Sequence, residues 1–268
     1  TQPVVLNATQ TLADHLAFTR YDGSKADSVE MPTLGADNGL ALVSMIGADY
    51  DDPQWDTLLD QLTFNEMVNT ITLGFHNTAA VESIGKTRTK DENGPQGLTA
   101  ALTGGASAMC YTSEDVMAAT FNVDLINDVG RCIGEDCLAM GYSGLYGPGI
   151  NMHRTAYSGR NFEYYASDPF VAGTICAAEV NGIQSKGVYV YLKHVALNDS
   201  ESSRRGVNTW LNEQAAREIY LEVADKAVTD GGAWNVMTGF NRWGAYWCGA
   251  YDNLLTSFLR GELGMRGM

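Results

Sequence analysis

The feature that most constrains the fold is a regular alternation of strand-like and helical segments from residue 94 onward. The clearest apolar run, 187–196, is rich in β-branched and aromatic residues, which is typical of a strand buried on both faces. A helical pattern follows at 212–229, and a second apolar run at 233–240 comes directly after it. Repeated strand–helix units with short connections predict a parallel sheet covered by helices.

The other elements are expected from capping residues and apolar spacing. They are a helix from a cap at Thr112 to about Met140 with Phe121, Leu125 and Val129 as its buried stripe, a short strand in 141–151, and helices at 171–185 and 253–263. We count about five or six strand–helix units, fewer than the eight of a closed barrel. The predicted fold class is α/β, an incomplete (β/α)8 TIM-type barrel with about its first six units.

Residues 1–48 differ from the rest of the chain. They are rich in Thr, Asp, Ala and Gly with weak periodicity, which predicts a linker or lead-in segment, and 49–268 is predicted to be the partial barrel. Trp55 begins a helical pattern, and Thr63 followed by Glu66 resembles a capping box that opens a second helix. We expect Met67 and Ile71 on the inner face of that helix.

Composition excludes several classes of function. The net charge of -15 argues against nucleic-acid binding, which needs clustered cations. The apolar runs are shorter than the roughly 20 residues of a membrane span. The five cysteines are odd in number and include no CxxC pair, which favours reduced thiols and a cytoplasmic protein. The first residue is Thr, so the localisation itself stays unknown.

Two polar segments follow predicted strands. Lys193 and His194 end the strand at 187–196, where a parallel α/β fold gathers its functional groups. A surface lysine beside a core histidine is the alternative. The polar loop that follows, with Asn198, Asp199, Glu201, Arg204 and Arg205, favours a site.

The second polar segment contains Arg154, Arg160 and Glu163 after the strand in 141–151. A solvated charge cluster is the alternative here. Because Phe162, Tyr164 and Tyr165 lie among these charges, a fixed and partly buried ion-pair network is favoured.

Metal and phosphate sites find little support. The four histidines show neither HxH nor HExxH spacing, so no metal is expected. Gly104-Gly105-Ala106-Ser107 lacks the Walker lysine, and there is no Gly-x-Ser-x-Gly turn for a serine hydrolase. No organic cofactor is expected either.

Several motifs together resemble glycoside hydrolase family 3, and the agreement runs from about residue 50 to the end. The motifs are Gly94-Pro95-Gln96-Gly97-Leu98, Gly147-Pro148-Gly149-Ile150-Asn151-Met152-His153-Arg154, Gly159-Arg160-Asn161-Phe162-Glu163-Tyr164, Lys193-His194, Arg217-Glu218-Ile219-Tyr220-Leu221 and Leu255-Thr256-Ser257-Phe258-Leu259-Arg260-Gly261-Glu262-Leu263-Gly264. The β-glucosidase and β-xylosidase branch is the more similar one. Segments 48–53 and 81–86 resemble members in which other domains precede the barrel.

The resemblance implies hydrolysis of terminal β-D-glycosidic bonds with retention, through an aspartate nucleophile and a separate glutamate acid/base. It places the nucleophile four residues after Met268 and the acid/base on another domain, so no catalytic residue is expected within the chain. Residues 1–268 by themselves are expected to be inactive. The implied contacts with the sugar are Asn93, Arg160, Lys193, His194, Arg204 and Phe240, with Glu163 and Arg154 in support.

Three positions depart from the family pattern: Asn93 replaces an aspartate, Thr99 an arginine and Phe240 a tyrosine. They motivate an alternative, a sugar-binding protein without activity. A third hypothesis is that the chain is an unrelated TIM-barrel metalloenzyme. The expected partners are a β-linked oligosaccharide or aryl β-glycoside and the remaining domains of the same polypeptide, with no nucleic acid and no membrane.

Overall fold

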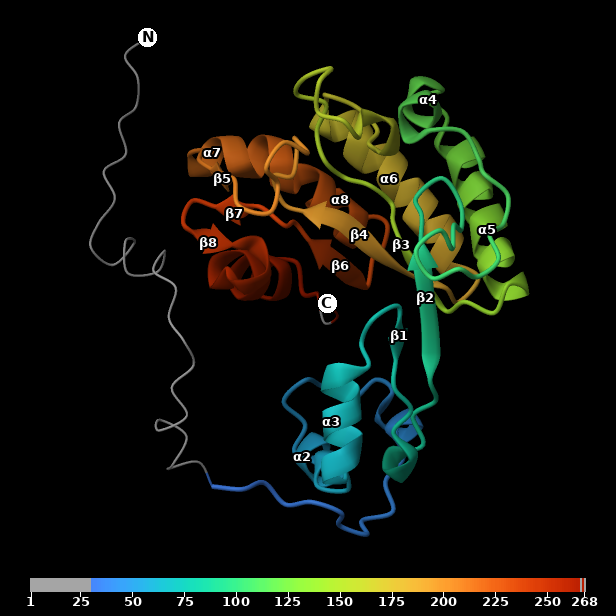
Figure 1. Cartoon of the computed structure of the whole chain (residues 1–268), viewed down its shortest axis with the longest axis vertical. Coiled ribbons are helices and arrows are strands. Elements are labelled where there is room, and N and C mark those ends of the chain that lie inside the picture. Colours follow the sequence, from blue (N-terminus) through green and yellow to red (C-terminus); the bar gives the residue numbers. More distant parts are fainter. Residues whose placement is uncertain (1–29, 266, 268) are drawn as a thin grey trace. The chain divides into compact units, whose positions relative to one another are not determined.

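The computed structural model describes residues 30–265 and 267 of the 268-residue chain. These residues form two compact units, one ending at Asp91 and the other beginning at Glu92 (Figure 1). Residues 1–29 of the predicted lead-in segment lie outside the described residues, and the predicted boundary between 48 and 49 stays a prediction.

The smaller unit is built from short helices around a small apolar core. Its elements are the 3₁₀ helices η2 (Leu42–Met45) and η3 (Glu82–Ile84), the helices α2 (Gln54–Leu59) and α3 (Phe64–Thr72), and the strands β1 (Asn77–Thr78) and β2 (Thr89–Asn93), whose last two residues belong to the larger unit. β1 and β2 pair antiparallel. The core consists of Met45, Leu58, Leu62, Val81 and Ile84.

The predicted capping box of α3 is confirmed. Glu66 N donates to Thr63 Oγ1 at 3.3 Å, and Thr63 N donates to Glu66 Oε2 at 2.8 Å. Hydrogen bonds from the backbone N–H groups of Ser83 and Thr63 lower the pKa of Glu66 to about 2. Met67 packs on the core as expected, but Ile71 is 82% exposed, so its predicted inner position is wrong.

The larger unit alternates strands and helices as predicted. Its elements are α4 (Glu114–Ala119), α5 (Val123–Ala139), β3 (Gly144–Tyr146), η4 (Asn161–Glu163), α6 (Pro169–Gln184), β4 (Tyr189–Val195), β5 (Asn208–Thr209), α7 (Glu213–Ala215), η5 (Ala216–Leu221), α8 (Glu222–Thr229), β6 (Asn235–Thr238), β7 (Arg242–Trp243), β8 (Tyr246–Trp247), η6 (Cys248–Ala250) and η7 (Asn253–Glu262). η4 and η6 are 3₁₀ helices, and η5 and η7 have π geometry.

The strands β3, β4 and β6 lie side by side and parallel, which confirms the predicted sheet. Gly144 pairs with Tyr189, and Tyr191 pairs with Asn235. β4 lies between β3 and β6, and all of its residues are buried except Tyr189 and Tyr191, which are half-buried. Lys193 and His194, at the carboxyl end of β4, therefore lie at the edge of the sheet where the loops that follow β3 and β6 meet.

The predicted single helix at 112–140 is wrong, because it is two helices. The chain breaks between α4 and α5 at Phe121, whose φ of 50° is left-handed, and Asn122 then caps α5 by accepting from Leu125 N at 3.0 Å. Phe121 and Leu125 are largely exposed rather than buried. The buried residues of α5 are Ile126, Gly130, Ile133, Gly134 and Cys137.

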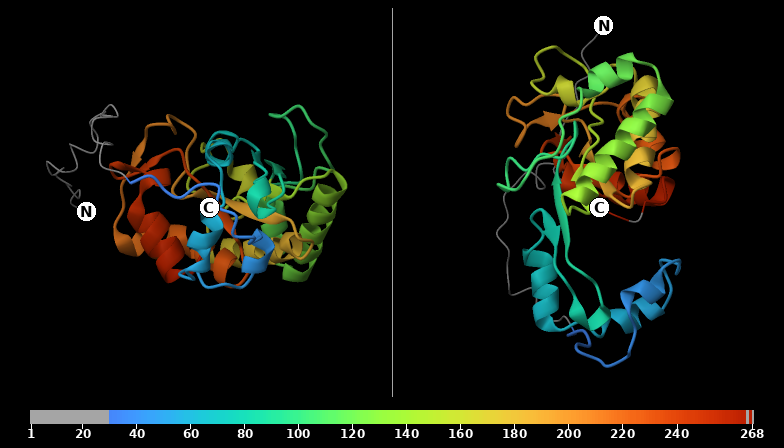
Figure 2. Two further views of the ribbon diagram at one scale, coloured as in Figure 1. Left: turned by 90° about the horizontal axis from the view of Figure 1, so that it is seen from below. Right: turned by 90° about the vertical axis from the view of Figure 1, so that its right-hand side faces the viewer.

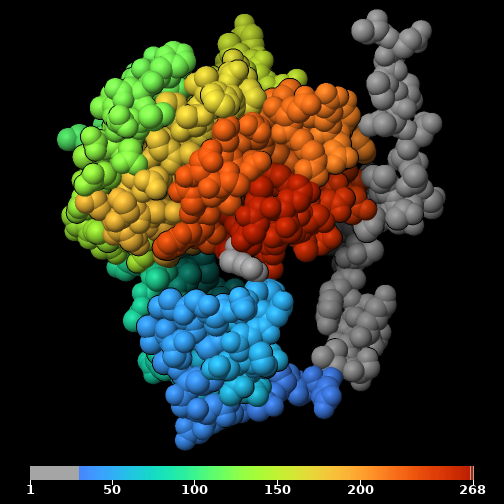
Figure 3. All heavy atoms as spheres, turned by 180° about the vertical axis from the view of Figure 1, so that it is seen from behind, coloured from blue at the N-terminus to red at the C-terminus, as the bar shows by residue number. Residues whose placement is uncertain are grey.

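Helices α5, α6 and α8 lie next to one another on one face of the sheet (Figures 1 and 2). In the view from behind, α5, α6, α8 and η7 follow one another across the surface of the larger unit in the order in which they occur along the chain (Figure 3). No helix among the described residues is long and apolar enough to span a membrane.

Glycines allow α5 and α6 to approach closely. A β-carbon on Gly182 would stand 2.2 Å from the Asn127 carbonyl oxygen, which is far inside van der Waals contact. We expect Gly182→Ala to destabilise the protein by about 1–3 kcal/mol, measured by urea unfolding, because the helices must separate. Gly206→Ala is the matched control, since nothing lies within 4 Å of its position. Equal stability of the two variants would contradict the close crossing.

Candidate active site

The carboxyl end of β4 places Lys193 and His194 in the interior, each only 4% exposed. Neighbouring backbone holds this end of the strand: Lys193 N donates to Pro148 O at 3.0 Å, and Ile150 N donates to Lys193 O at 2.6 Å. Lys193 and His194 thus lie between strand β6 and the loop that follows β3.

A buried carboxylate, Glu163 on η4, joins two cations. Lys193 Nζ lies 3.1 Å from Glu163 Oε2, and Arg160 Nε donates to Glu163 Oε1. Burial lowers the pKa of Lys193, although the adjacent Glu163 charge opposes this effect. Glu163 therefore fixes both cations in one geometry.

A second carboxylate, Glu201, extends this network. Its Oε1 lies 3.5 Å from Arg160 Nη1, and its Oε2 lies 2.7 Å from Arg204 Nη1. The Arg204 guanidinium in turn lies over the Phe240 ring, 4.8 Å from the ring centroid. Arg160, Lys193, Arg204 and Phe240 are therefore brought together, as the sequence predicts. We refer to these four residues with Glu163 and Glu201 as the ion-pair network.

His194 is held by two polar side chains that were not predicted. Its Nδ1 lies 3.1 Å from the Tyr164 hydroxyl and 3.2 Å from Asn151 Oδ1. Asn151 also accepts from His194 N at 2.9 Å. Burial, followed by the charges of Arg160, Lys193 and Arg204, lowers the pKa of His194 well below its ordinary value. The imidazole is therefore neutral at pH 7, a state suited to hydrogen bonds with hydroxyl groups.

Asn93 adjoins the network through its neighbour. Lys193 Nζ donates to the carbonyl oxygen of Gly94 at 3.2 Å. The Asn93 amide nitrogen donates to Glu92 Oε1 at 3.1 Å, and Glu92 is fully buried. Asn93 therefore stands beside Lys193 with one end of its amide already bonded.

Arg154 belongs to a different cluster. Its guanidinium lies over the Tyr220 ring at 5.8 Å from the centroid, and its charge acts on Asp199. Burial raises the pKa of Asp199 to about 6, against the hydrogen bond from Met152 N and the Arg154 charge. No contact joins Arg154 to the ion-pair network within the described residues.

Behind η4 lies a pair of fully buried carboxyl groups, Glu114 of α4 and Glu179 of α6. Tyr165 donates to Glu179 Oε2 at 2.6 Å, and Gln96 donates to Glu114 Oε2. The Oε1 atom of each glutamate has no hydrogen-bond partner in the described structure. Burial raises the pKa of Glu179 to about 7, and burial together with the Glu179 charge raises the pKa of Glu114 well above its ordinary value.

This pair should make the protein less stable as the pH rises. Both folded-state pKa values exceed the unfolded value of 4.5, so the stabilising neutral forms are complete below that pH and are lost as pH rises through about 7. We expect the unfolding free energy to fall by a few kcal/mol between about pH 5 and about pH 8, at about 1.4 kcal/mol per unit change in pKa. Glu179→Gln should flatten this dependence, whereas Glu135→Gln on the surface should not. A wild-type profile that rises over this range would contradict the assignment.

No group of three or more His, Cys, Asp or Glu side chains among residues 30–265 and 267 is arranged to hold a metal ion. All five cysteines are free thiols. The ion-pair network contains three cations and two carboxylates and lies beside the neutral imidazole of His194, so most of its charge is balanced. Such a set of fixed donors and acceptors suits a neutral ligand with several hydroxyl groups.

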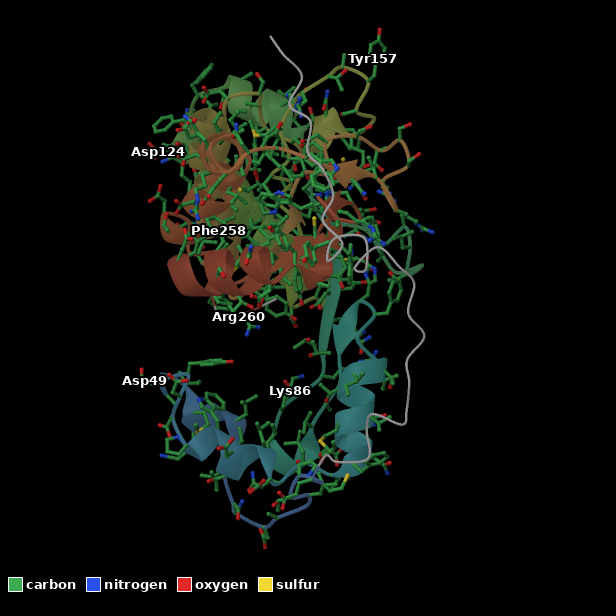
Figure 4. All side chains as sticks on the ribbon, turned by 90° about the vertical axis from the view of Figure 1, so that its left-hand side faces the viewer. Asp49, Lys86, Asp124, Tyr157, Phe258 and Arg260 are labelled. Carbon is green, nitrogen blue, oxygen red and sulfur yellow. The ribbon has the colours of Figure 1, made fainter. Side chains whose placement is uncertain are left out.

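Tyr157 lies in the loop that contains the second polar segment but is not part of the ion-pair network. It is 94% exposed and its side chain projects from the loop (Figure 4).

Comparison with known proteins gives a consistent result. The model of the glycosyl hydrolase family 3 N-terminal domain matches residues 67–268. A β-glucosidase of Rhizobium radiobacter is 34% identical over 80% of the chain, and an exo-α-(1→6)-L-arabinopyranosidase of Bifidobacterium breve is 34% identical over 66%. The chain covers 26% and 24% of these two relatives, about a quarter of their length.

A solved structure, β-glucosidase 3B of Thermotoga neapolitana in complex with glucose, is also similar. It superposes with a TM-score of 0.67 at 34% identity, covering 72% of this chain and 28% of that one. The parallel sheet of the larger unit is thus part of a TIM-like barrel. Because the family model spans most of its length, the chain belongs to glycoside hydrolase family 3.

Proposed function

We propose that this chain forms the glycone-binding part of a retaining β-glycosidase of the β-glucosidase type. The observation that carries the proposal is the ion-pair network with the neutral His194 beside it. Lys193, Arg160 and His194 offer hydrogen-bond donors at fixed positions, and Lys193 and His194 are buried. Charge-assisted donors of this kind hold sugar hydroxyls and orient the ring for attack at the anomeric carbon.

The nucleophile, in this proposal, is an aspartate four residues after Met268. Support comes from Gly267, where an added β-carbon would stand 2.5 Å from the Trp234 carbonyl oxygen, at the start of β6. A strand continuing from there parallel to β6 would bring the fourth residue after Met268 level with Phe240. That residue would then stand beside Arg204, which lies over the Phe240 ring.

The reaction would follow the two steps of retaining hydrolysis. The aspartate attacks the anomeric carbon while a glutamate from another domain protonates the leaving oxygen, and water then releases the sugar. Lys193 and Arg204 would stabilise the nucleophile and the bound hydroxyls by their charge. We further propose that the chain supplies about six units of the barrel, and that Arg154 plays its supporting part through Tyr220 and Asp199 rather than through the ion-pair network.

A sugar-binding protein without activity is the second candidate. Asn93, Thr99 and Phe240 favour it, because a phenylalanine cannot donate the hydrogen bond that a tyrosine would give a nucleophile. Such a protein would bind a β-linked oligosaccharide through the same network and release it unchanged.

The test uses the full-length polypeptide and 4-nitrophenyl β-glucoside. Proton NMR during hydrolysis should show the β-anomer of the sugar first, as retention requires. Residues 1–268 alone should release no nitrophenol. Binding of the sugar without hydrolysis would select the inactive alternative, and first appearance of the α-anomer would contradict the proposed mechanism.

A further inference from the structure

We propose that Glu92 is a positioning residue that fixes the amide of Asn93 so that only its oxygen faces a bound sugar. This inference rests on the proposed function for the identity of the ligand. Glu92 is fully buried, and its Oε1 accepts from Asn93 N at 2.9 Å and from Asn93 Nδ2 at 3.1 Å. Thr103 Oγ1 donates to Glu92 Oε2, so both carboxylate oxygens are engaged.

The orientation of the amide follows from the chemistry of its partner. A carboxylate only accepts hydrogen bonds, so the Asn93 nitrogen must face Glu92 and the Asn93 oxygen must point away. The peptide around Asn93 is fixed as well, because Thr99 N donates to Asn93 O at 2.8 Å and Lys193 Nζ bonds to the carbonyl of Gly94. Asn93 thus has a fixed backbone and one amide oxygen that Glu92 does not hold, and the adjacent Gly94 bonds to Lys193 of the ion-pair network.

This arrangement explains how asparagine can occupy a position where the family carries aspartate. An unrestrained asparagine amide could turn either its NH2 group or its oxygen toward the ligand. Only the orientation with the oxygen toward the ligand replaces the aspartate. With Glu92 holding the nitrogen, the Asn93 oxygen accepts a hydrogen bond from a hydroxyl group, as a carboxylate oxygen would. The negative charge of the pair then resides on Glu92, behind the side chain that meets the sugar.

The consequence is that the family's own residue should be harmful here. Asn93→Asp would place a second carboxylate where the amide nitrogen now lies 3.1 Å from the buried Glu92 Oε1, and two like charges at that distance repel strongly. The introduced carboxylate would have to turn away from Glu92, which moves its oxygens out of position, or take up a proton, which costs free energy at neutral pH. Glu92→Gln should relieve the conflict, because a neutral amide in place of Glu92 no longer repels the introduced carboxylate.

The experiment measures kcat and KM of the full-length protein for 4-nitrophenyl β-glucoside in wild type, N93D, E92Q and the double variant E92Q/N93D. We expect N93D to lower kcat/KM at least tenfold, about 1.4 kcal/mol, and the double variant to recover to within about threefold of wild type. Asp124→Asn on the exposed surface of α5 is the control for a changed charge, with no expected effect (Figure 4). Full activity of N93D, or a double variant no better than N93D, would overturn the inference.

A thermal-unfolding cycle on the same four proteins tests the contact without any substrate. N93D should melt below wild type, and the double variant should melt above N93D. If wild type neither hydrolyses nor binds the glucoside, the proposed function fails, while the melting cycle still decides the Glu92–Asn93 contact. Additive melting shifts would show that the two side chains are not coupled and would overturn the inference. An N93D protein that does not fold, together with a folded double variant, would support it.

Discussion

Replacing Lys193 by alanine in the full-length protein is expected to lower kcat/KM for an aryl β-glucoside at least about a hundredfold, or about 2.7 kcal/mol of transition-state binding. The side chain is 5% exposed and is held by Glu163 and the Gly94 carbonyl, so its charge acts in a buried site where a hydrogen bond to the reacting sugar is strong. His194→Ala should have a comparable effect, because its imidazole is fixed by Tyr164 and Asn151.

Lys186→Ala is the matched control for this prediction. Lys186 also pairs with a glutamate, since its Nζ lies 2.6 Å from Glu135 Oε1, but that pair is on the surface. Steady-state kinetics should leave the control within about twofold of wild type, because exposed ion pairs contribute little. A Lys193→Ala protein with near-wild-type kinetics would remove Lys193 from the sugar-binding site.

Replacing Glu163 by alanine is expected to destabilise the protein by about 3–5 kcal/mol, measured by urea unfolding. Lys193 would then lie buried without its carboxylate, and Arg160 would lose its closest partner. Part of the loss should be recovered at about pH 9, because burial already lowers the pKa of Lys193 and an unpaired Lys193 loses its proton more readily. The stability of this variant therefore rises with pH.

Two further proteins separate this buried pair from ion pairing in general. Glu135→Ala breaks the surface pair with Lys186 and should cost less than about 1 kcal/mol. Glu163→Gln combined with Lys193→Met removes both charges and should be more stable than Glu163→Ala. If Glu163→Ala and Glu135→Ala were equally stable, Glu163 would not be compensating a buried charge.

The order of strands and helices could be predicted from the sequence because each element carries its own signal. The apolar run at 187–196 became β4, and the pattern at 171–185 became α6. The break at Phe121 could not be predicted, since the apolar spacing continues across it and the turn depends on packing of α4 against other elements. Which face of α5 is buried was missed because the stripe was assigned through Phe121 and Leu125, whereas Ile126 and Ile133 are the buried apolar residues and Gly130 lies between them at the close contact with α6.

The candidate site was predictable to the extent that it lies at strand ends. Lys193 and His194 end β4, and the Arg160–Glu163 pair follows β3, so the parallel sheet brings them together. Glu201 was noted in the polar loop but not assigned to the site, although its spacing of three from Arg204 is a usual one for an ion pair. Asn151 and Tyr164 were missed, because the partners of a buried histidine depend on loop geometry that no local pattern reports.

The central claim is that the sugar-binding half of a retaining glycosidase lies in this chain and meets its nucleophile on the following strand. The most direct measurement is to trap the covalent intermediate of the full-length protein with a 2-deoxy-2-fluoro-β-glucoside and to locate the label by peptide mass spectrometry. We expect the sugar on an aspartate four residues after Met268, with labelling abolished in Lys193→Ala. A label on any residue within 30–268, or steady hydrolysis without a trapped sugar, would contradict the claim.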